Sequence, residues 1–201
     1  TFMKLKRLLS VLDVCECTAD PELDIRDISF DSRTTQPGDL FAAVCGYESD
    51  GHRFIGAAAE RGVAVVLCQR KPEVEIPYIL VADSRLALSR ICCEWYDSPS
   101  RELTMIGVTG TKGKTTTAYM IYEILRKAGI RAGLIGTIET RIGEKSILSE
   151  NTTPEPVVLQ KLFSEMMREG CTHVVMEVSS QAEKQHRCDG FTFDYGVFTN
   201  I

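Results

Sequence analysis

The sequence predicts an α/β fold in two parts, and three observations support that prediction. Apolar runs of strand character alternate with segments whose apolar residues recur at helical spacing, which is typical of mostly parallel sheets covered by helices. A turn-rich break, Asp97-Ser98-Pro99-Ser100-Arg101, separates two such series. In the second series a strand, a glycine turn and a helix follow one another without a gap. We therefore expect domains at residues 1–97 and 98–201.

The first part is expected to form a compact α/β unit. Gly62 ends its first helix, and Asp83 or Ser84 caps its second helix, which continues through Tyr96. Helical spacing of the apolar residues in this second helix marks its core face. The expected strands cover residues 40–45, 63–68 and 78–82, the first helix covers 53–61, and the core candidates of the second helix are Leu86, Leu88, Ile91 and Trp95.

The second part is expected to form a mostly parallel sheet covered on both faces. One helix is expected to start with Thr153 as its cap and Pro154 as its first residue, and to stop at Gly170. Ligands bind at the carboxyl ends of parallel strands, so the glycine turn and the ends of the last two strands should face one crevice. The expected strands cover residues 104–109, 131–137, 173–178 and 196–199, and the helix after the glycine turn covers 115–128.

The glycine turn is the most informative motif of the chain. It reads Gly110-Thr111-Lys112-Gly113-Lys114-Thr115-Thr116, between a strand and a helix. Such a turn directs backbone N–H groups at one point, where the helix N-terminus adds positive potential that suits phosphate. Lys114 would then reach the β and γ phosphates, and the Thr115 hydroxyl would ligate Mg²⁺. The loop is shorter than the standard P-loop pattern G-x-x-x-x-G-K-[ST], because Val108 stands where the first glycine of that pattern would be. The alternative to a phosphate-binding loop is a plain glycine turn with an exposed lysine.

Three further groups carry polar side chains at expected strand ends or loops. Glu177 ends a strand and could reach a metal on the glycine turn, or it could make only a local hydrogen bond. Arg187 could hold a carboxylate or phosphate with its planar fork, or it could be a solvated surface arginine. Asn151-Thr152-Thr153 has the composition of an ordinary helix start.

Composition excludes several classes of function. The net charge of −5 and the pI of about 5.3 give no general attraction to nucleic acid or to an anionic membrane. No apolar run approaches ~20 residues, so no membrane span is expected. The eight cysteines contain no C-x-x-C pair, and three histidines lack ligand spacing, so we expect reduced thiols, no zinc site and a cytoplasmic protein.

Seven short segments together show a family resemblance that covers nearly the whole chain. On these segments the chain resembles the Mur ligases, and among them the MurE type. The segments are Asp31-Ser32-Arg33, Pro37-Gly38-Asp39-Leu40-Phe41, Asp50-Gly51, residues 110–116, Asn151-Thr152-Thr153-Pro154-Glu155, Glu177-Val178-Ser179-Ser180 and Phe198-Thr199-Asn200. Two positions depart from the commonest pattern of the family: Lys112 stands where Asn is usual, and Gln181 where His is usual.

The resemblance implies a function and a role for each matching residue. It implies an ATP-dependent, Mg²⁺-dependent ligase that joins lysine or meso-diaminopimelate to UDP-N-acetylmuramoyl-L-alanyl-D-glutamate through an acyl phosphate, with no nucleic acid or membrane partner. Lys114 and Glu177 would be catalytic, and Thr115 and Glu177 would ligate the metal. The nucleotide would contact Gly110, Thr111, Lys112, Gly113, Lys114, Thr115 and Thr116, and the muramoyl substrate would contact Phe30, Ser32, Tyr47, Glu48, Ser49, Asn151, Thr152, Thr153, Ser179, Gln185 and Arg187.

The resemblance also sets expectations for the domains. Residues 1–97 would bind the UDP-sugar, and residues 98–201 would be the first part of a truncated P-loop ATPase domain, so this chain alone is expected to be inactive. Two alternatives remain open at this stage: another amide ligase of the Mur superfamily, and a P-loop module that binds nucleotide without ligase activity.

Overall fold

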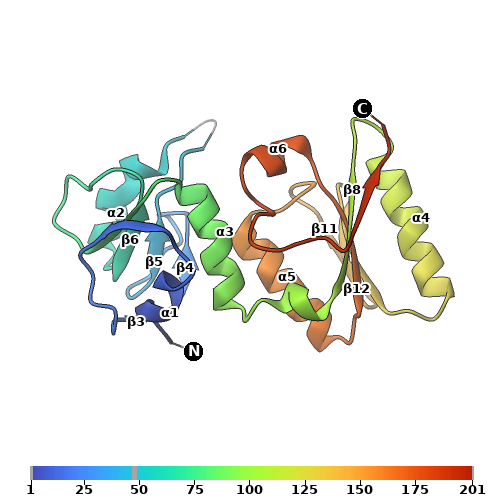
Figure 1. Ribbon diagram of the computed structural model, residues 1–201, viewed down its shortest axis with the longest axis horizontal. Coiled ribbons are helices and arrows are strands. Elements are labelled where there is room, and N and C mark those ends of the chain that lie inside the picture. The colour runs from blue at the N-terminus through green and yellow to red at the C-terminus, as the bar shows by residue number, and fades with distance from the viewer. Residues whose placement is uncertain (1, 47–48, 201) are drawn as a thin grey trace. The chain divides into compact units, whose positions relative to one another are not determined.

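The computed structural model describes residues 2–46 and 49–200, which divide into two compact units. The first unit ends at Trp95, and the second begins at Tyr96. Each unit has its own mixed sheet and helices (Figure 1), so the predicted α/β class is confirmed. Among the described residues, no helix combines the length and apolarity that crossing a bilayer requires.

The first unit is built on a five-stranded sheet in the order β2-β7-β6-β5-β4. Strands β4 to β7 are parallel, and β2 pairs antiparallel with β7 at the edge. A small antiparallel pair of β1 and β3 lies outside this sheet. The strands are β1 (Met3–Lys4), β2 (Val14–Cys17), β3 (Asp24–Ile25), β4 (Ile28–Ser29), β5 (Leu40–Ala42), β6 (Val65–Cys68) and β7 (Tyr78–Val81), and the helices are α1 (Leu5–Leu9), the 3-10 turn η1 (Gly51–Phe54), α2 (Ile55–Glu60) and α3 (Ser84–Trp95).

The apolar residues of this unit pack in part as their spacing predicts. Asp83 caps α3, since its carboxylate accepts the backbone N–H groups of Arg85 and Leu86 at 2.8 and 3.0 Å. Of the four core candidates on this helix, Leu88 and Ile91 are buried. Strand β5 is buried at every position, as expected of a central parallel strand covered on both faces.

The second unit is built on a six-stranded sheet in the order β11-β10-β9-β12-β8-β13. The four strands β9, β12, β8 and β13 are parallel, and β10 and β11 form an antiparallel hairpin at one edge. The strands are β8 (Thr104–Thr109), β9 (Ala132–Ile135), β10 (Glu139–Ile142), β11 (Lys145–Leu148), β12 (His173–Glu177) and β13 (Tyr195–Phe198), and the helices are η2 (Pro99–Glu102), α4 (Lys114–Lys127), α5 (Pro156–Arg168) and α6 (Ser180–Lys184).

Helices α4 and α5 lie on opposite faces of this sheet (Figure 1). Successive side chains of a central strand pack alternately against one helix and the other. On β12, Val175 packs in the cluster with Ala118 and Tyr122 of α4. Its neighbour Val174 packs in the cluster with Phe163 of α5. Successive strand residues point to opposite faces, so one continuous apolar strand supplies both cores.

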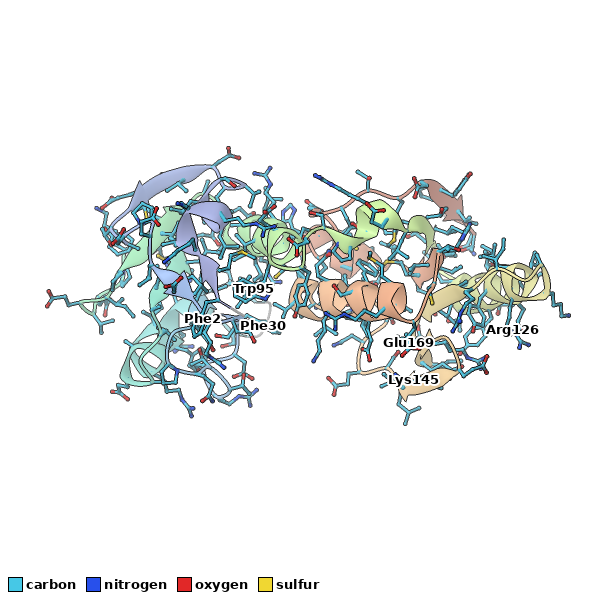
Figure 2. The ribbon with its side chains drawn as sticks, turned by 90° about the horizontal axis from the view of Figure 1, so that it is seen from below. Phe2, Phe30, Trp95, Arg126, Lys145 and Glu169 are labelled. Carbon is cyan, nitrogen blue, oxygen red and sulfur yellow. The ribbon has the colours of Figure 1, made fainter. Side chains whose placement is uncertain are left out.

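Two sequence expectations for this unit need correction. Helix α5 begins at Pro156 with Glu155 as its N-cap residue, not at Pro154 with Thr153. Both prolines suit a first helical position, but the Thr153 hydroxyl is committed to the backbone of β12, as described below. The hairpin β10–β11 was not predicted, and its end is joined to the turn after α5 by an ion pair of 2.9 Å between Lys145 and Glu169 (Figure 2).

Candidate active site

The glycine turn, called the phosphate loop below, is residues 110–113 between β8 and α4. Gly110 and Gly113 have φ values of +135° and +82°, a region that side chains other than glycine rarely adopt. A Cβ at Gly110 would also collide with the Thr199 hydroxyl. Both positions therefore require glycine. Gly113 is required by its backbone conformation, and Gly110 is required also because the chain that follows β13 lies against it.

Lys114 is the first residue of α4, and its ammonium group lies across the phosphate loop. Its Nζ atom donates a hydrogen bond of 2.7 Å to the Gly110 carbonyl. The first four N–H groups of a helix have no intrahelical acceptor, and the helix dipole makes this end positive. The loop thus combines a fixed cation with backbone donors, which is the requirement for holding phosphate oxygens.

Glu177 ends β12 and is the centre of a hydrogen-bond cluster. Its side chain is 1% exposed. The Thr115 hydroxyl donates to Oε2 at 3.0 Å, and Thr137 donates its backbone N–H to Oε1 at 2.9 Å and its hydroxyl to Oε2 at 3.0 Å. Gly136 leaves space for this carboxylate, since a Cβ there would approach Oε1 to 2.5 Å. The fold therefore brings Thr115 and Glu177 together across 62 residues of sequence.

Thr115 and Glu177 have the chemistry of a magnesium site. Mg²⁺ prefers hard oxygen ligands, and usually takes one or two from the protein while keeping several waters. The Thr115 hydroxyl and the Glu177 carboxylate are such ligands, and they lie at the end of the phosphate loop. The donor set therefore fits the ion, which would neutralise negative charge on phosphate bound at the loop.

Thr153 connects this cluster to the polar segment 179–187. Its hydroxyl donates to the Glu177 carbonyl at 2.9 Å and accepts the Ser179 N–H at 3.1 Å. Its own carbonyl accepts from Arg187 at 2.6 Å. Thr153 is buried, and its two backbone-directed bonds position the turn between β12 and α6.

Arg187 is not the solvated surface arginine that was one of its two interpretations. Its side chain is 15% exposed and forms an ion pair of 2.7 Å with Glu155. Its Nε and Nη2 atoms also donate to Gln185 Oε1 at 3.0 and 2.7 Å, and its Nη1 atom donates to the Thr153 carbonyl. In this arrangement the guanidinium braces the segments at 153–155 and 185–187, so a ligand that used the fork would have to replace Glu155 or Gln185.

The other predicted substrate residues of this unit differ in their surroundings. The Thr152 hydroxyl lies 3.1 Å from that of Thr137, at the rim of the Glu177 cluster. The Ser179 hydroxyl accepts the Ala182 N–H at 3.2 Å and caps α6. Asn151 is exposed. Thr152 is therefore connected to Glu177 through the Thr137 hydroxyl.

In the first unit, the turn at residues 30–35 follows β4. Asp31 accepts the backbone N–H and the side chain of Arg33, and the guanidinium lowers the pKa of the Asp31 carboxyl. Ser32 is buried and Phe30 is half-buried. Both lie at the carboxyl edge of the parallel strands, where ligands of α/β sheets bind.

The loop after β5 holds the remaining predicted UDP-sugar contacts. Tyr47 and Glu48 lie outside the described residues. Ser49 is exposed, and its carbonyl accepts the Gly46 N–H at 2.8 Å. The base of the loop is held by Arg85, which donates to the Cys45 carbonyl at 2.6 Å.

A cluster of Cys45, Asp50 and His52 in the same loop was not expected from the sequence. Their potential ligand atoms lie within 4.8 Å of one another. However, His52 Nε2 accepts the Gln69 N–H at 2.9 Å, so the neutral ring carries its proton on Nδ1, which lies 2.7 Å from Asp50 Oδ1. A protonated nitrogen cannot ligate a metal. Burial opposes ionisation of Asp50, but hydrogen bonds from His52 and Arg70 outweigh it and hold the pKa of the carboxyl below its usual range.

Sequence reasoning missed two residues of the second unit that contact the site. Thr137 binds Glu177, and Asn200 binds the phosphate loop. Each directly follows an expected parallel strand or ends it, so the rule that ligand sites lie at carboxyl strand ends could have marked both. Neither was singled out for a role, since a single threonine or asparagine in a turn has no distinctive pattern.

Comparison with known protein families gives two matches that follow one another along the chain. The family described as "Mur ligase family, catalytic domain" matches residues 24–96, and the family described as "Mur ligase middle domain" matches residues 108–201. The chain belongs to the Mur ligase family. Within this Mur ligase chain, the phosphate loop and the Glu177 cluster lie in the middle domain.

Curated relatives and solved structures agree with that assignment. A UDP-N-acetylmuramoyl-L-alanyl-D-glutamate–2,6-diaminopimelate ligase of Geobacillus thermodenitrificans is 45% identical over 199 residues, and one of Cytophaga hutchinsonii is 41% identical over 203; each match covers 99% of this chain and 41% or 42% of the relative. A solved structure of a ligase with the same name has a TM-score of 0.83 at 25% identity and covers 100% of this chain and 40% of that one.

A more distant solved structure was determined with a nucleotide. The MurF ligase of Thermotoga maritima in complex with ADP has a TM-score of 0.58 at 26% identity, covering 88% of this chain and 38% of that one. The Mur ligase chain described here spans about two-fifths of the length of the relatives it matches.

Proposed function

We propose that this chain is part of an ATP-dependent amide ligase that adds 2,6-diaminopimelate to UDP-N-acetylmuramoyl-L-alanyl-D-glutamate in peptidoglycan synthesis, forming ADP. The observation that supports it most is the meeting of Lys114, Thr115 and Glu177 at the end of β8 and β12. The names of the relatives, at 41% and 45% identity, support the choice of substrate and amino acid.

The residues of the second unit have roles that follow from the chemistry. A carboxylate is a poor electrophile, so it would first take the γ-phosphoryl group of ATP, forming an acyl phosphate and releasing ADP. The amine would then attack the acyl carbon, forming the amide bond and displacing inorganic phosphate. Phosphoryl transfer depends on positioning and on neutralisation of charge. Lys114 and the backbone N–H groups at the start of α4 would orient the phosphates. Mg²⁺, held by Thr115 and Glu177, would supply Lewis-acid neutralisation of the phosphate oxygens when bound.

Each unit carries residues that are predicted to bind part of the substrate. In this proposal Phe30, Ser32 and the loop with Tyr47, Glu48 and Ser49 bind the UDP-sugar. The dipeptide side of the muramoyl substrate contacts Asn151, Thr152, Thr153, Ser179, Gln185 and Arg187. Residues 1–97 would be the UDP-sugar domain, and residues 98–201 would belong to the ATPase domain. The cytoplasmic location expected from the cysteine content of the sequence is part of this proposal.

The full-length ligase of which this chain is a part provides the test. Phosphate release is measured with ATP, Mg²⁺ and UDP-N-acetylmuramoyl-L-alanyl-D-glutamate, with either meso-diaminopimelate or lysine as the amine. The proposal expects turnover with diaminopimelate and its loss in Lys114→Ala. Turnover with lysine alone would refute the amino-acid assignment. Nucleotide binding without turnover of any muramoyl peptide would favour a module that only binds nucleotide.

A further inference from the structure

Asn200 makes the largest number of side-chain contacts with the phosphate loop among the described residues. Its Oδ1 atom accepts the Thr111 N–H at 3.0 Å, the Thr111 hydroxyl at 2.6 Å and the Lys112 N–H at 3.1 Å. Its Nδ2 atom donates to the Lys112 carbonyl at 3.0 Å. The two ends of the amide face donors and an acceptor respectively, so the orientation of the amide group follows from its neighbours.

Thr199 adds a second set of contacts to the same segment. Its hydroxyl lies 2.5 Å from the Lys112 carbonyl and 3.2 Å from the Thr109 carbonyl. Gly110 has no space for a Cβ on this side because the Thr199 hydroxyl and the Asn200 backbone lie against it. The chain after β13 therefore packs directly on the phosphate loop, across 87 to 90 residues of sequence.

These contacts allow two roles for Asn200. Its amide oxygen could occupy the N–H groups of Thr111 and Lys112 only until phosphate displaces it, or it could hold the loop in place permanently. Phosphate oxygens accept hydrogen bonds, so they could replace Oδ1 at the two N–H groups, but they could not replace Nδ2 at the Lys112 carbonyl. The hydroxyl of the preceding residue, Thr199, is held to the same Lys112 carbonyl, so the backbone that carries Asn200 is itself fixed against the loop. The geometry favours the permanent brace.

We propose that Asn200 is a positioning residue that keeps the phosphate loop in its binding shape before nucleotide arrives. In this proposal, which rests on the proposed nucleotide site, Thr111 and Lys112 do not give their N–H groups to phosphate. The phosphates are received by Lys114 and the free N–H groups of the first turn of α4. A loop that is already ordered loses less conformational entropy on binding, and this is how the brace contributes to affinity.

Amide hydrogen exchange tests the brace without any nucleotide. In the unaltered chain, the N–H groups of Thr111 and Lys112 should be protected from exchange. Asn200→Ala should raise their exchange rates at least roughly tenfold, because it removes the shared acceptor. Thr172→Ala is the control, since Thr172 precedes β12 at the opposite end of the sheet, and it should leave both rates unchanged. Unchanged rates in Asn200→Ala would overturn the proposal.

Affinity for ADP with Mg²⁺, measured by calorimetry, separates the two roles. The brace predicts roughly tenfold weaker binding by Asn200→Ala, equivalent to about 1.4 kcal/mol. A displaced occupant predicts unchanged or tighter binding, and that result would overturn the proposal. Asn200→Asp keeps the acceptor and removes the donor while adding a negative charge; it should keep Thr111 and Lys112 protected but bind ADP more weakly than the unaltered chain.

The two measurements also distinguish this proposal from the proposed nucleotide site. If the unaltered chain does not bind ADP, the nucleotide site is refuted, while the exchange rates still decide whether Asn200 holds the loop. If the chain binds ADP and Asn200→Ala binds it equally well, the nucleotide site stands and the positioning role is refuted. Melting temperatures of the variants should stay close to that of the unaltered chain, because Asn200 is exposed.

Discussion

The candidate sites of the two units are held together in different ways. In the second unit, Thr115 bonds Glu177 across 62 residues and Thr111 bonds Asn200 across 89. In the first unit, the turn after β4 is held mainly by Asp31 and Arg33, two residues apart. The phosphate site thus depends on the tertiary fold, whereas the turn that is proposed to contact UDP depends on local bonds. Substitutions in the first kind of site should affect folding as well as binding.

Glu177→Ala should give the largest loss of stability. It removes the acceptor of the Thr115 hydroxyl and of the Thr137 backbone N–H and leaves a cavity in a buried place, for which we expect a destabilisation of about 3 kcal/mol. Urea unfolding followed by circular dichroism measures this, and hydrogen exchange of β12 amides shows whether the second unit is the part affected. Asp31→Ala is the matched variant in the first unit, where the pair is exposed; its cost should be under about 1 kcal/mol. Equal costs for the two variants would contradict the comparison.

Lys114→Ala should give the largest loss of nucleotide affinity. A hydrogen bond to a charged group contributes about 1.5–3 kcal/mol, so the affinity for ADP with Mg²⁺ should fall roughly 10- to 150-fold. Lys112→Ala is the control, because Lys112 stands where the family commonly has a neutral residue; it should change the affinity less than about threefold. Binding by Lys114→Ala at the level of the unaltered chain would show that the phosphate loop is wrongly assigned.

Glu139, in the hairpin of the second unit, should make the stability of that unit decrease at acidic pH. Hydrogen bonds from Ser146 and Tyr119, together with Arg141, lower the pKa of Glu139 from 4.5 to about 2. A lowered folded-state pKa means that the stabilisation is present above pH 4.5 and is lost as the pH falls towards 2. When the pH falls from 4.5 to 2, the free energy of unfolding of Glu139→Gln should therefore decrease by about 2 kcal/mol less than that of the unaltered chain. Urea unfolding of both proteins, repeated across this pH range, measures the difference. An equal decrease of the free energy of unfolding in the two proteins would contradict the role of Glu139.

Ser32→Ala should have the smallest effect and should be confined to one ligand. Loss of a single hydroxyl contact weakens binding by about 0.5–1.5 kcal/mol, so the affinity for UDP-N-acetylmuramoyl-L-alanyl-D-glutamate should fall roughly 2- to 12-fold. The affinity for ADP should not change. The single tryptophan, Trp95 at the end of α3 (Figure 2), reports whether the first unit remains folded. A reduced affinity for ADP in this variant would mean that the sites are not separate.

Local signals were sufficient for the parts of the fold that obey local rules. The strand, phosphate loop and helix at 104–127 were predicted within one residue, because the apolar runs, the glycines and the helical spacing coincide there. The hairpin β10–β11 was missed because β11 is exposed at every position and so lacks the alternation that identifies a half-buried strand. From the sequence, α5 was expected to start at Pro154, whereas the helix begins at Pro156, because the Thr153 hydroxyl bonds the backbone of β12 instead of capping the helix.

The candidate site was predictable to a similar extent. Lys114, Thr115 and Glu177 were singled out because a motif or a strand end marks them. The roles of Thr137 and Asn200 depend on which turns lie side by side, and that is fixed by the strand order β9-β12-β8-β13. A single sequence does not specify strand order, so their contacts with Glu177 and the phosphate loop required the structure.

The central claim is that the chain carries a phosphate site in the second unit and a separate UDP-sugar site in the first. One titration tests it most directly: the backbone amide resonances of the labelled chain are followed during addition of ADP with Mg²⁺, and then of UDP-N-acetylmuramoyl-L-alanyl-D-glutamate. The account predicts that ADP shifts the resonances of residues 110–116 and leaves those of Phe30 and Ser32 unchanged, and that the muramoyl nucleotide shifts Phe30 and Ser32 without displacing ADP. Displacement of ADP by the muramoyl nucleotide, with no shift at Phe30 or Ser32, would contradict it.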